Sequence, residues 1–387
     1  MATDRHDKSL FVQDGECAVP PQDCPPAINT NTPCVRTDVL TGRQIIVAEN
    51  RSARPVTLTQ SSAAPPAADD PFLEGRETLT PGETLALRAA DSKPNEPGWL
   101  LRVVPNEYPA AEFSVSDVSE RHETSEVFPS QSVRGIHEVV VECPDYRSRL
   151  ADLSVGEVAR ILYAWQLRVR TLAALPWIKA ISVFRNEGMG AGASLPHCHS
   201  QILATDFIGG RIARQTDRAQ QSRQKTGRCV VEEWLSEELA ANQRVLRRDR
   251  HFAAICPFAS RVPWQVRFVP LAVNQFEQMS AEQILSLAAQ LHSVATAVHA
   301  VANNVNHNVI LTLPPTATPD AFQWHVDLLP RPNRMAGFEF GTDVDILAVS
   351  PETAVAQLRE RLPPVVTPCD ADALCPDGYR WVETGTE

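Results

Sequence analysis

The sequence predicts an α+β protein made of two halves, each an antiparallel sheet crossed by one long helix. The length of 387 residues suits two core-forming units of about 100–200 residues each. Strand patterns and amphipathic helices alternate, and their order repeats. Ser154 and Ser280 precede the two long helices and lie 126 residues apart, while His197 and His325 lie 128 apart. This near-constant spacing indicates an internal duplication.

The chain divides into four parts by composition and pattern. Residues 1–34 form a polar, proline-rich leader, 35–208 the N-terminal half, 209–362 the C-terminal half and 363–387 a tail without an assigned function. Residues 56–97 are rich in Pro, Ala, Ser and Thr, and we expect mostly loop there.

The elements of the first half follow from local patterns. A strand over 44–48 follows the turn signal Thr41-Gly42. Ser154 is the expected N-cap of a helix, because Glu157 stands at its third position and an amphipathic run follows. Further strands are predicted at 99–110 (ending in a turn), 137–144, 178–186 and 199–207.

The second half repeats this order. Ser280 is the expected N-cap of a second long amphipathic helix over 281–302. Strands are predicted at 252–259, 264–270, 309–315 and 322–330.

Charge, hydropathy and cysteine usage exclude several protein classes. The net charge of −11 disfavours nucleic-acid binding. No run approaches the ~18 apolar residues of a membrane span, and the first ten residues lack the apolar stretch of a secretory signal. The nine cysteines contain no C-x-x-C pair, so neither a disulfide framework nor a cysteine zinc knuckle is indicated. We therefore expect a soluble cytoplasmic protein that binds neither nucleic acid nor membrane.

The segment GASLPHCHSQ (192–201) contains the closest grouping of candidate catalytic side chains in the sequence. Alternate residues of a strand share a face, so His197, His199 and Gln201 are expected in one polar row. A glycine-rich turn precedes them, and its successive N–H groups could form an anion nest. The alternatives are a purely structural row and a zinc pair, and the latter would need further ligands. Beside an anion cradle, the imidazoles favour phosphoryl or nucleotidyl transfer.

This segment resembles the active-site strand of the histidine-triad superfamily, in the branch of galactose-1-phosphate uridylyltransferases and ADP-glucose phosphorylases. The resemblance extends over about 35–362 and includes the following segments: RTDVLTGRQIIVAENRSARP, LRVVPNEYP, HEVVVECPDYRSRLADLS, VFRNEGMGAGAS, FQWHVDLLPR and MAGFEFGT. It implies a duplicated histidine-triad-like fold.

The resemblance also implies a mechanism. His199 would attack the α-phosphorus of a nucleotide sugar and form a covalent nucleotidyl-histidine, which a second phosphate then resolves. Nδ1 of His199 would donate to the carbonyl of His197, leaving Nε2 free. Gln201 would donate to a phosphoryl oxygen, Ser194 would bond the phosphates, and His197 would orient the nucleophile.

Binding residues are carried over by position. Asn106 and Glu107 would lie near the nucleoside, and Asn186 and Gly192 near the α- and β-phosphates. Arg51 and Arg54 would face the sugar phosphate, possibly across a dimer interface, because guanidinium binds phosphate bidentately. Glu339 would accept sugar hydroxyls. For both arginines and Glu339 the alternative is an ordinary solvated surface residue.

The family's metal sites are degraded in this sequence. Asp70 and Leu73 stand where its zinc cysteines would be, and Tyr146 replaces a zinc-binding histidine. At a second metal site His325 remains, but Asp327 and Thr312 replace ligands. Cys229 lacks the companion cysteines found in phosphorylase-like relatives. We therefore predict no metal and no cofactor at these places.

Taken together, the sequence predicts a nucleotidyltransferase of carbohydrate metabolism that acts on a nucleotide sugar and a sugar 1-phosphate or phosphate. The leading prediction is hexose-1-phosphate uridylyl transfer from UDP-glucose, as in galactose metabolism. The alternatives are an ADP-glucose phosphorylase and a non-catalytic nucleotide-sugar-binding protein. Resemblance to the family implies a homodimer.

Overall fold

The computed structural model describes residues 33–53, 70–112, 127, 133–332, 334–365 and 371–384. Its main sheet has eleven strands, and all their pairings are antiparallel. In spatial order they are β14 (Tyr379–Glu383), β3 (Leu85–Ala89), β4 (Trp99–Pro105), β5 (Gly135–Val141), β7 (His199–Thr205), β6 (Ala180–Glu187), β11 (His307–Thr312), β12 (His325–Pro330), β10 (Val266–Pro270), β9 (Phe252–Ile255) and β8 (Val245–Arg248). The mixed architecture with an antiparallel sheet agrees with the predicted class.

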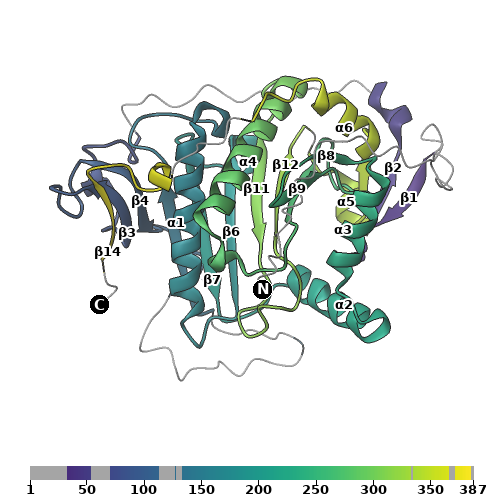
Figure 1. Cartoon of the computed structure of the whole chain (residues 1–387), viewed down its shortest axis with the longest axis horizontal. Coiled ribbons are helices and arrows are strands. Elements are labelled where there is room, and N and C mark those ends of the chain that lie inside the picture. Colours follow the sequence, from purple (N-terminus) through teal and green to yellow (C-terminus); the bar gives the residue numbers. More distant parts are fainter. Residues whose placement is uncertain are drawn as a thin grey trace, which may run out of the picture.

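Strand order is symmetric about the central pair β6–β11. On either side follow β7 and β12, then β5 and β10, β4 and β9, and β3 and β8. Along the chain each set of five strands is interrupted by one long helix after its third strand. The two sets of strands are joined at β6 and β11 into one continuous sheet (Figure 1).

In the part of the chain that the structure describes, six α-helices accompany the sheet. They are α1 (Val155–Ala173), α2 (Gly210–Thr226), α3 (Val230–Ala241), α4 (Ala281–Val301), α5 (Gly337–Thr342) and α6 (Pro351–Arg359). Ser154 and Ser280 form the predicted capping boxes of α1 and α4, with Glu157 and Gln283. A small sheet, β1 (Cys34–Thr37), β2 (Gln44–Val47) and β13 (Asp345–Leu347), lies beside α5 at one end of the molecule (Figure 1).

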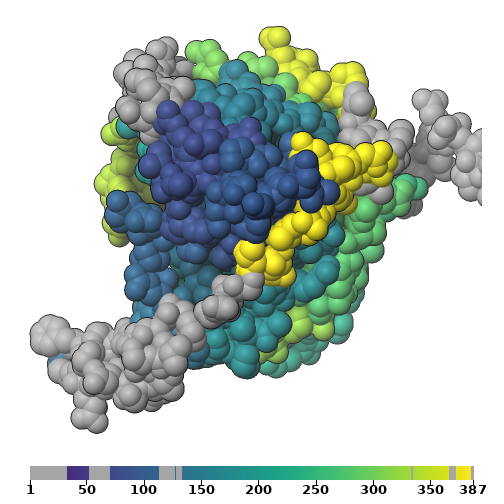
Figure 2. Space-filling model, turned by 90° about the vertical axis from the view of Figure 1, so that its left-hand side faces the viewer, coloured from purple at the N-terminus to yellow at the C-terminus, as the bar shows by residue number. Residues whose placement is uncertain are grey.

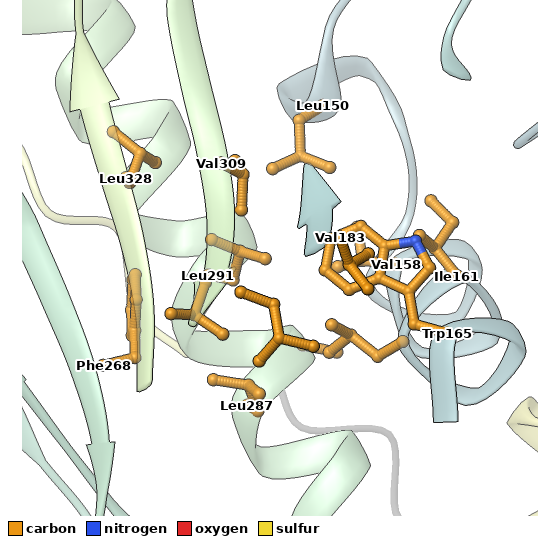
Figure 3. Packing of buried hydrophobic residues seen from close by; sticks show 14 of the residues in the cluster. Leu150, Val158, Ile161, Trp165, Val183, Phe268, Leu287, Leu291, Val309 and Leu328 are labelled. Carbon is orange, nitrogen blue, oxygen red and sulfur yellow. The ribbon is translucent and has the colours of Figure 1, made fainter. Parts of the chain in front are cut away.

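The main core lies between the sheet and the helices α1 and α4, which pack side by side on one face (Figure 1). Trp165 and Ile161 of α1 and Leu287 and Leu291 of α4 meet sheet residues such as Val183 there (Figure 3). In length and composition α4 could cross a membrane, but most of it is buried inside the molecule. Its apolar character is therefore that of a core helix.

Two segments outside the predicted elements contribute strands to the main sheet. The expected loop over 56–97 contains β3, which is buried and pairs with β4. The tail contributes β14, which pairs with β3 and completes that edge of the sheet. Figure 2 shows this C-terminal segment (yellow) lying along segments from the first third of the chain (blue). Both strands are short and lie in weakly patterned sequence, so only tertiary pairing reveals them.

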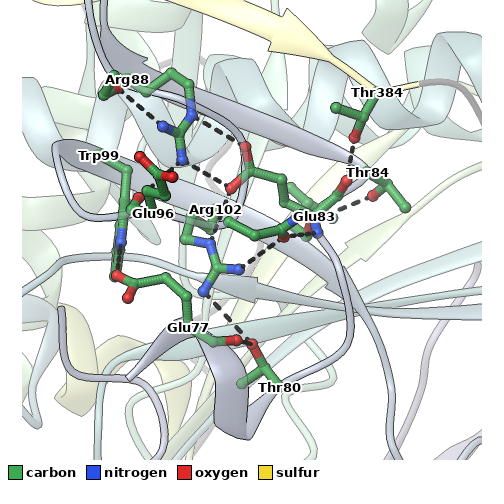
Figure 4. Close-up of polar contacts among 12 residues, drawn as sticks. Glu77, Thr80, Glu83, Thr84, Arg88, Glu96, Trp99, Arg102 and Thr384 are labelled. Atoms are coloured by element: carbon green, nitrogen blue, oxygen red, sulfur yellow. Dashed lines mark hydrogen bonds and ion pairs between the residues drawn. The ribbon is translucent and has the colours of Figure 1, made fainter. Parts of the chain in front are cut away.

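A buried ionic network anchors the segment that leads to β3 (Figure 4). Glu83 accepts two hydrogen bonds of 3.0 Å from Arg88 and one of 3.1 Å from Arg102. Trp99 donates to Glu77 at 2.7 Å, which ties the 3₁₀ turn Glu77–Leu79 to β4. The network thus fixes the stretch just after Asp70, a residue of the site described next.

Candidate active site

Strand β7 presents its two faces to different surroundings. Trp165 of α1 donates to Ser200 Oγ at 2.8 Å, so Ser200 points to the helix-covered face. Cys198 contacts Arg185 at 3.2 Å in the same buried layer. Because side chains alternate along a strand, His199 and Gln201 point to the opposite face.

His199 is buried (5% exposed) and held in one orientation. Its Nδ1 lies 2.8 Å from the carbonyl oxygen of His197, the contact predicted from the sequence. The ring of Phe72 packs against it with centroids 5.5 Å apart. Burial lowers the pKa of His199, so the imidazole is neutral at pH 7. Since Nδ1–H donates to the carbonyl, Nε2 carries the lone pair.

His197 has the opposite character. Its Nδ1 lies 2.5 Å from Asp70 Oδ2 and its Nε2 lies 2.9 Å from the carbonyl of Cys143. Burial alone would lower the pKa of His197, but the hydrogen bond to Asp70 and the contact with Cys143 raise it to about 10. Both ring nitrogens therefore carry protons and donate. The two hydrogen bonds hold the His197 residue in place, and its backbone carbonyl is the one that accepts from His199 Nδ1.

Gln201 is oriented by His137 of β5, a residue that the sequence analysis did not single out. Ala110 N donates to His137 Nδ1 at 3.1 Å, so the proton of the neutral ring lies on Nε2. That nitrogen lies 2.9 Å from Gln201 Oε1. With its oxygen engaged, Gln201 keeps its NH₂ group available as a donor. The sequence gives little indication of this contact, because His137 and Gln201 are 64 positions apart.

The glycine turn between β6 and β7 is closed on itself. Gly188 and Gly192 have φ of 81° and 94°, which favours glycine. The N–H groups of Ala191, Gly192 and Ala193 bond to carbonyls within the turn. These three groups cannot form the expected anion nest, so that prediction is wrong for them. Asn308 of β11 supports the turn instead, donating at 2.8 Å to both Asn186 Oδ1 and the carbonyl of Ala191.

The other residues predicted to bind the nucleoside and phosphates lie in the turns that follow β4 and precede β7. Asn106 follows β4, and its Nδ2 lies 3.4 Å from His137 Nε2. Glu107 is exposed in the following turn, and Ser194 is exposed just after the glycine turn. Asn106 and Gln201 thus share a contact through His137.

Arg51 and Glu339 do not join this group within one chain. Arg51 is exposed in the 3₁₀ turn Glu49–Ala53 after β2, and Glu339 accepts from Ala336 N at 3.0 Å at the start of α5. Among the described residues, no contact links either one to β7. Arg54 lies outside the described residues.

Comparisons with known proteins place this chain in a family. Residues 24–209 match the family of galactose-1-phosphate uridyl transferase, N-terminal domain, and residues 161–368 match a domain of unknown function, DUF4921. A galactose-1-phosphate uridylyltransferase of Thermotoga maritima is 30% identical over 245 residues, 60% of this chain and 76% of that protein. The chain belongs to the galactose-1-phosphate uridylyltransferase family.

This chain also resembles an ADP-glucose phosphorylase over most of its length. An ADP-glucose phosphorylase of Arabidopsis thaliana is 27% identical over 344 residues, 86% of this chain and 94% of that protein. A crystal structure of an Arabidopsis thaliana ADP-glucose phosphorylase with bound ADP-glucose matches with a TM-score of 0.69 at 26% identity, covering 85% and 99% of the two chains. The chain is a nucleotidyltransferase of this family.

The residues at the place of the family's structural zinc do not fit a metal. Asp70, Phe72 and Tyr146 surround His197, and the rings of Tyr146 and His197 are 6.1 Å apart. Protonated at both nitrogens, His197 has no lone pair for a cation. Leu73 has no donor atom, and burial raises the pKa of Tyr146, so its side chain is a protonated phenol, which is not among the usual zinc ligands. An ion pair between Asp70 and His197 stands in this position.

The second family metal site does not fit a cation either. Asp327 accepts from Arg267 at 2.9 and 3.0 Å and lies 3.6 Å from Arg211. Both guanidinium groups bring positive charge next to His325, and burial first and then Arg267 lower the pKa of that histidine to about 3. An ion pair between Arg267 and Asp327 stands in this position.

Proposed function

We propose that this chain transfers a nucleoside monophosphate between a nucleotide sugar and a phosphate acceptor through a covalent adduct on His199. The observation that carries the proposal is the state of His199. Its Nδ1 is bonded to a fixed backbone carbonyl, so a neutral imidazole offers Nε2 as nucleophile. Among the described residues, no protein group hydrogen-bonds that Nε2.

The first half-reaction forms one bond and breaks one. The Nε2 lone pair attacks the α-phosphorus, and the bond from this phosphorus to the bridging oxygen breaks. The electron pair leaves with the sugar 1-phosphate. In the second half-reaction an oxygen of the acceptor phosphate attacks the same phosphorus, and the P–N bond returns its electron pair to Nε2. The His197 carbonyl accepts from Nδ1–H throughout, which stabilises the cationic adduct.

Gln201 supplies charge stabilisation without acid catalysis. Its NH₂ group can donate to a non-bridging oxygen of the α-phosphate, where charge develops in the transition state. A phosphate leaving group needs no proton at neutral pH, so an amide suffices where an alkoxide would require an acid. Asn186 and Ser194 are proposed to bind the phosphates, which would lie close to the backbone at Gly192, and Asn106 and Glu107 are proposed to bind the nucleoside.

Two donors are candidates, each supported by a different comparison. UDP-glucose with a hexose 1-phosphate acceptor is the first, because a uridylyltransferase is 30% identical to this chain over 245 residues. ADP-glucose with inorganic phosphate is the second, because an ADP-glucose phosphorylase aligns over 94% of its own length. The chemistry at His199 is the same in both.

Isotope exchange tests the proposal and distinguishes the donors. Labelled glucose 1-phosphate is incubated with the enzyme and either UDP-glucose or ADP-glucose, with no second acceptor present. A covalent adduct predicts label in the nucleotide sugar of the correct base, and no exchange with His199→Ala. Absence of exchange with both donors, in protein that binds either one, would support a binding protein instead.

The arginines and Glu339 are proposed to act in a homodimer. Arg51 is exposed and does not contact β7 of its own chain, and Phe340 on α5 is 75% exposed beside Glu339. We infer that this end of each subunit covers the other subunit's His199. Arg51, Arg54 and Glu339 would then bind the sugar phosphate across the interface.

The two halves of the sheet are proposed to derive from one duplicated unit. The mirror-related strand order and the matching capping boxes of α1 and α4 support this origin. When the two halves are matched about β6 and β11, β12 corresponds to β7, and His325 on β12 corresponds to the histidines at the start of β7. Superposition of the two halves tests the idea, with equivalent strands expected to overlap in register.

A further inference from the structure

Three buried side chains converge on the helix-covered face of the sheet, behind the glycine turn. Glu187 ends β6, His307 begins β11 and His299 lies in the last turn of α4. They are 5%, 0% and 8% exposed. The sheet register pairs Glu187 directly with His307, and α4 brings His299 above them. One nitrogen or oxygen atom from each residue lies within 4.8 Å of the other two.

These groups are close without forming hydrogen bonds. His299 Nε2 lies 2.7 Å and His307 Nδ1 lies 3.4 Å from Glu187 Oε1. Yet that oxygen and all four ring nitrogens lack a hydrogen bond of acceptable geometry. Buried polar atoms without partners cost free energy. A cation bound between Glu187, His299 and His307 would give one unpartnered atom of each residue a ligand bond.

The second oxygen of Glu187 is already fixed. Oε2 accepts from Arg185 at 2.6 Å and from the backbone N–H of Leu150 at 2.6 Å. Oε1 is thereby held toward the two imidazoles. Metal-binding carboxylates are commonly oriented by such outer hydrogen bonds.

The local charge also favours a cation. Arg185 pairs with Glu142 at 2.9 Å as well as with Glu187, so two buried carboxylates share one guanidinium. The two carboxylates and the single guanidinium leave one negative charge in excess, which a bound cation would neutralise.

We propose that Glu187, His299 and His307 bind one divalent transition-metal cation, zinc by the character of its donors. Two imidazoles and one carboxylate form a known zinc ligand set, with a fourth position for water. Bonds of about 2.0–2.1 Å to a tetrahedral zinc separate ligand atoms by about 3.4 Å. The contact from His307 already has that length, and the contact from His299 would lengthen.

The site would be structural, and it does not depend on the proposed function. It joins β6, β11 and α4 at the point where the glycine turn begins, because Gly188 follows Glu187 directly. Asn186 and Asn308 are bonded on the opposite face of the same two strands. A cation here would hold the base of the turn from behind.

Metal content of the full-length chain tests the proposal. The protein is purified without chelators, its affinity tag is removed, and elemental analysis is followed by zinc and cobalt titration of the chelator-treated protein. We expect about one zinc per chain, visible absorption bands of tetrahedral Co²⁺, and a zinc-induced rise in Tm of at least about 2 °C.

Variants locate the metal. His299→Ala, His307→Ala and the nearly isosteric Glu187→Gln are expected to lose bound zinc and the rise in Tm. His325→Ala is the matched control, because it removes another buried histidine beside a carboxylate on the other half of the sheet, and it should bind as wild type does. If the alanine variants do not fold, Glu187→Gln and the wild-type cobalt spectrum decide. A wild-type chain that binds no zinc, or a metal lost only in His325→Ala, would overturn the proposal.

Discussion

His199 and His197 stand two positions apart and are held in opposite protonation states. Burial lowers the pKa of His199, whereas the bond to Asp70 and the contact with Cys143 overcome burial and raise the pKa of His197 to about 10. The neutral ring can therefore act as a nucleophile, and the charged ring holds the carbonyl that orients it. This difference depends on Asp70, which is 127 residues from His197 in sequence.

The pH profile of kcat/KM reports the protonation state of His199. Because the pKa of His199 is lowered from its ordinary value of 6.5, the imidazole is neutral at and above that pH. We expect kcat/KM to stay constant from about pH 6.5 to 8.5 and to fall only below pH 6.5. An acid limb centred at pH 7 or higher would contradict the lowered pKa.

Asp70→Asn tests the second state. Loss of the charged hydrogen bond should lower the free energy of unfolding by about 1.5–3 kcal/mol near pH 6. A raised histidine pKa contributes stability that is complete below pH 6.5 and is lost as pH rises toward about 10, so the deficit of the variant should shrink over that range. Denaturant unfolding at pH 6, 8 and 10 measures this. A deficit that does not change with pH would show that Asp70 does not hold the proton on His197.

At the scale of elements, the register of β5 against β7 places His137 beside Gln201. We expect Gln201→Ala to lower kcat by about 10²-fold, as for loss of one transition-state donor. His137→Leu should lower kcat about tenfold with little change in KM, because the amide loses its orientation but not its chemistry. His137→Gln keeps a donor of similar reach and should restore most of kcat. Steady-state kinetics decide, and equal losses in the Leu and Gln variants would oppose a positioning role.

Sequence patterns predicted the elements whose signals are local. The capping boxes of α1 and α4 gave correct helix starts, and the strand patterns located β5, β6, β7, β10 and β12. The helix α2 was missed, since only two of its residues, Gln215 and Ala219, are buried and it shows no broad apolar face. Strands β3 and β14 were missed because each depends on its partner strand.

The candidate site divides in the same way. His197, His199, Gln201 and the glycine turn are contiguous, so a single motif predicted them. His137, Asp70 as a charge partner, and the cluster of Glu187, His299 and His307 come from separate segments that only the folded sheet brings together. Three N–H groups of the glycine turn bond to carbonyls of the same turn, and the spacing of the glycines in the sequence does not predict these bonds.

At the scale of the whole molecule, the homodimer proposal predicts subunit complementation. His199→Ala and Arg51→Ala homodimers should each be nearly inactive. In a mixed dimer one site combines an intact His199 with an intact Arg51 from the other subunit. After unfolding and refolding of an equal mixture, about one quarter of the sites should regain activity. Recovery no greater than the sum of the two parents would place Arg51 in its own subunit's site or outside it.

The central claim is that His199 becomes covalently nucleotidylated, and intact-protein mass spectrometry tests it most directly. The protein is incubated separately with UDP-glucose and ADP-glucose and quenched without acid, because phosphoramidates are acid-labile. The account predicts a mass increase of one UMP or one AMP with one donor, reversed by the acceptor phosphate and absent in His199→Ala. An adduct that persists in His199→Ala, or turnover of a donor with no adduct at any time, would contradict it.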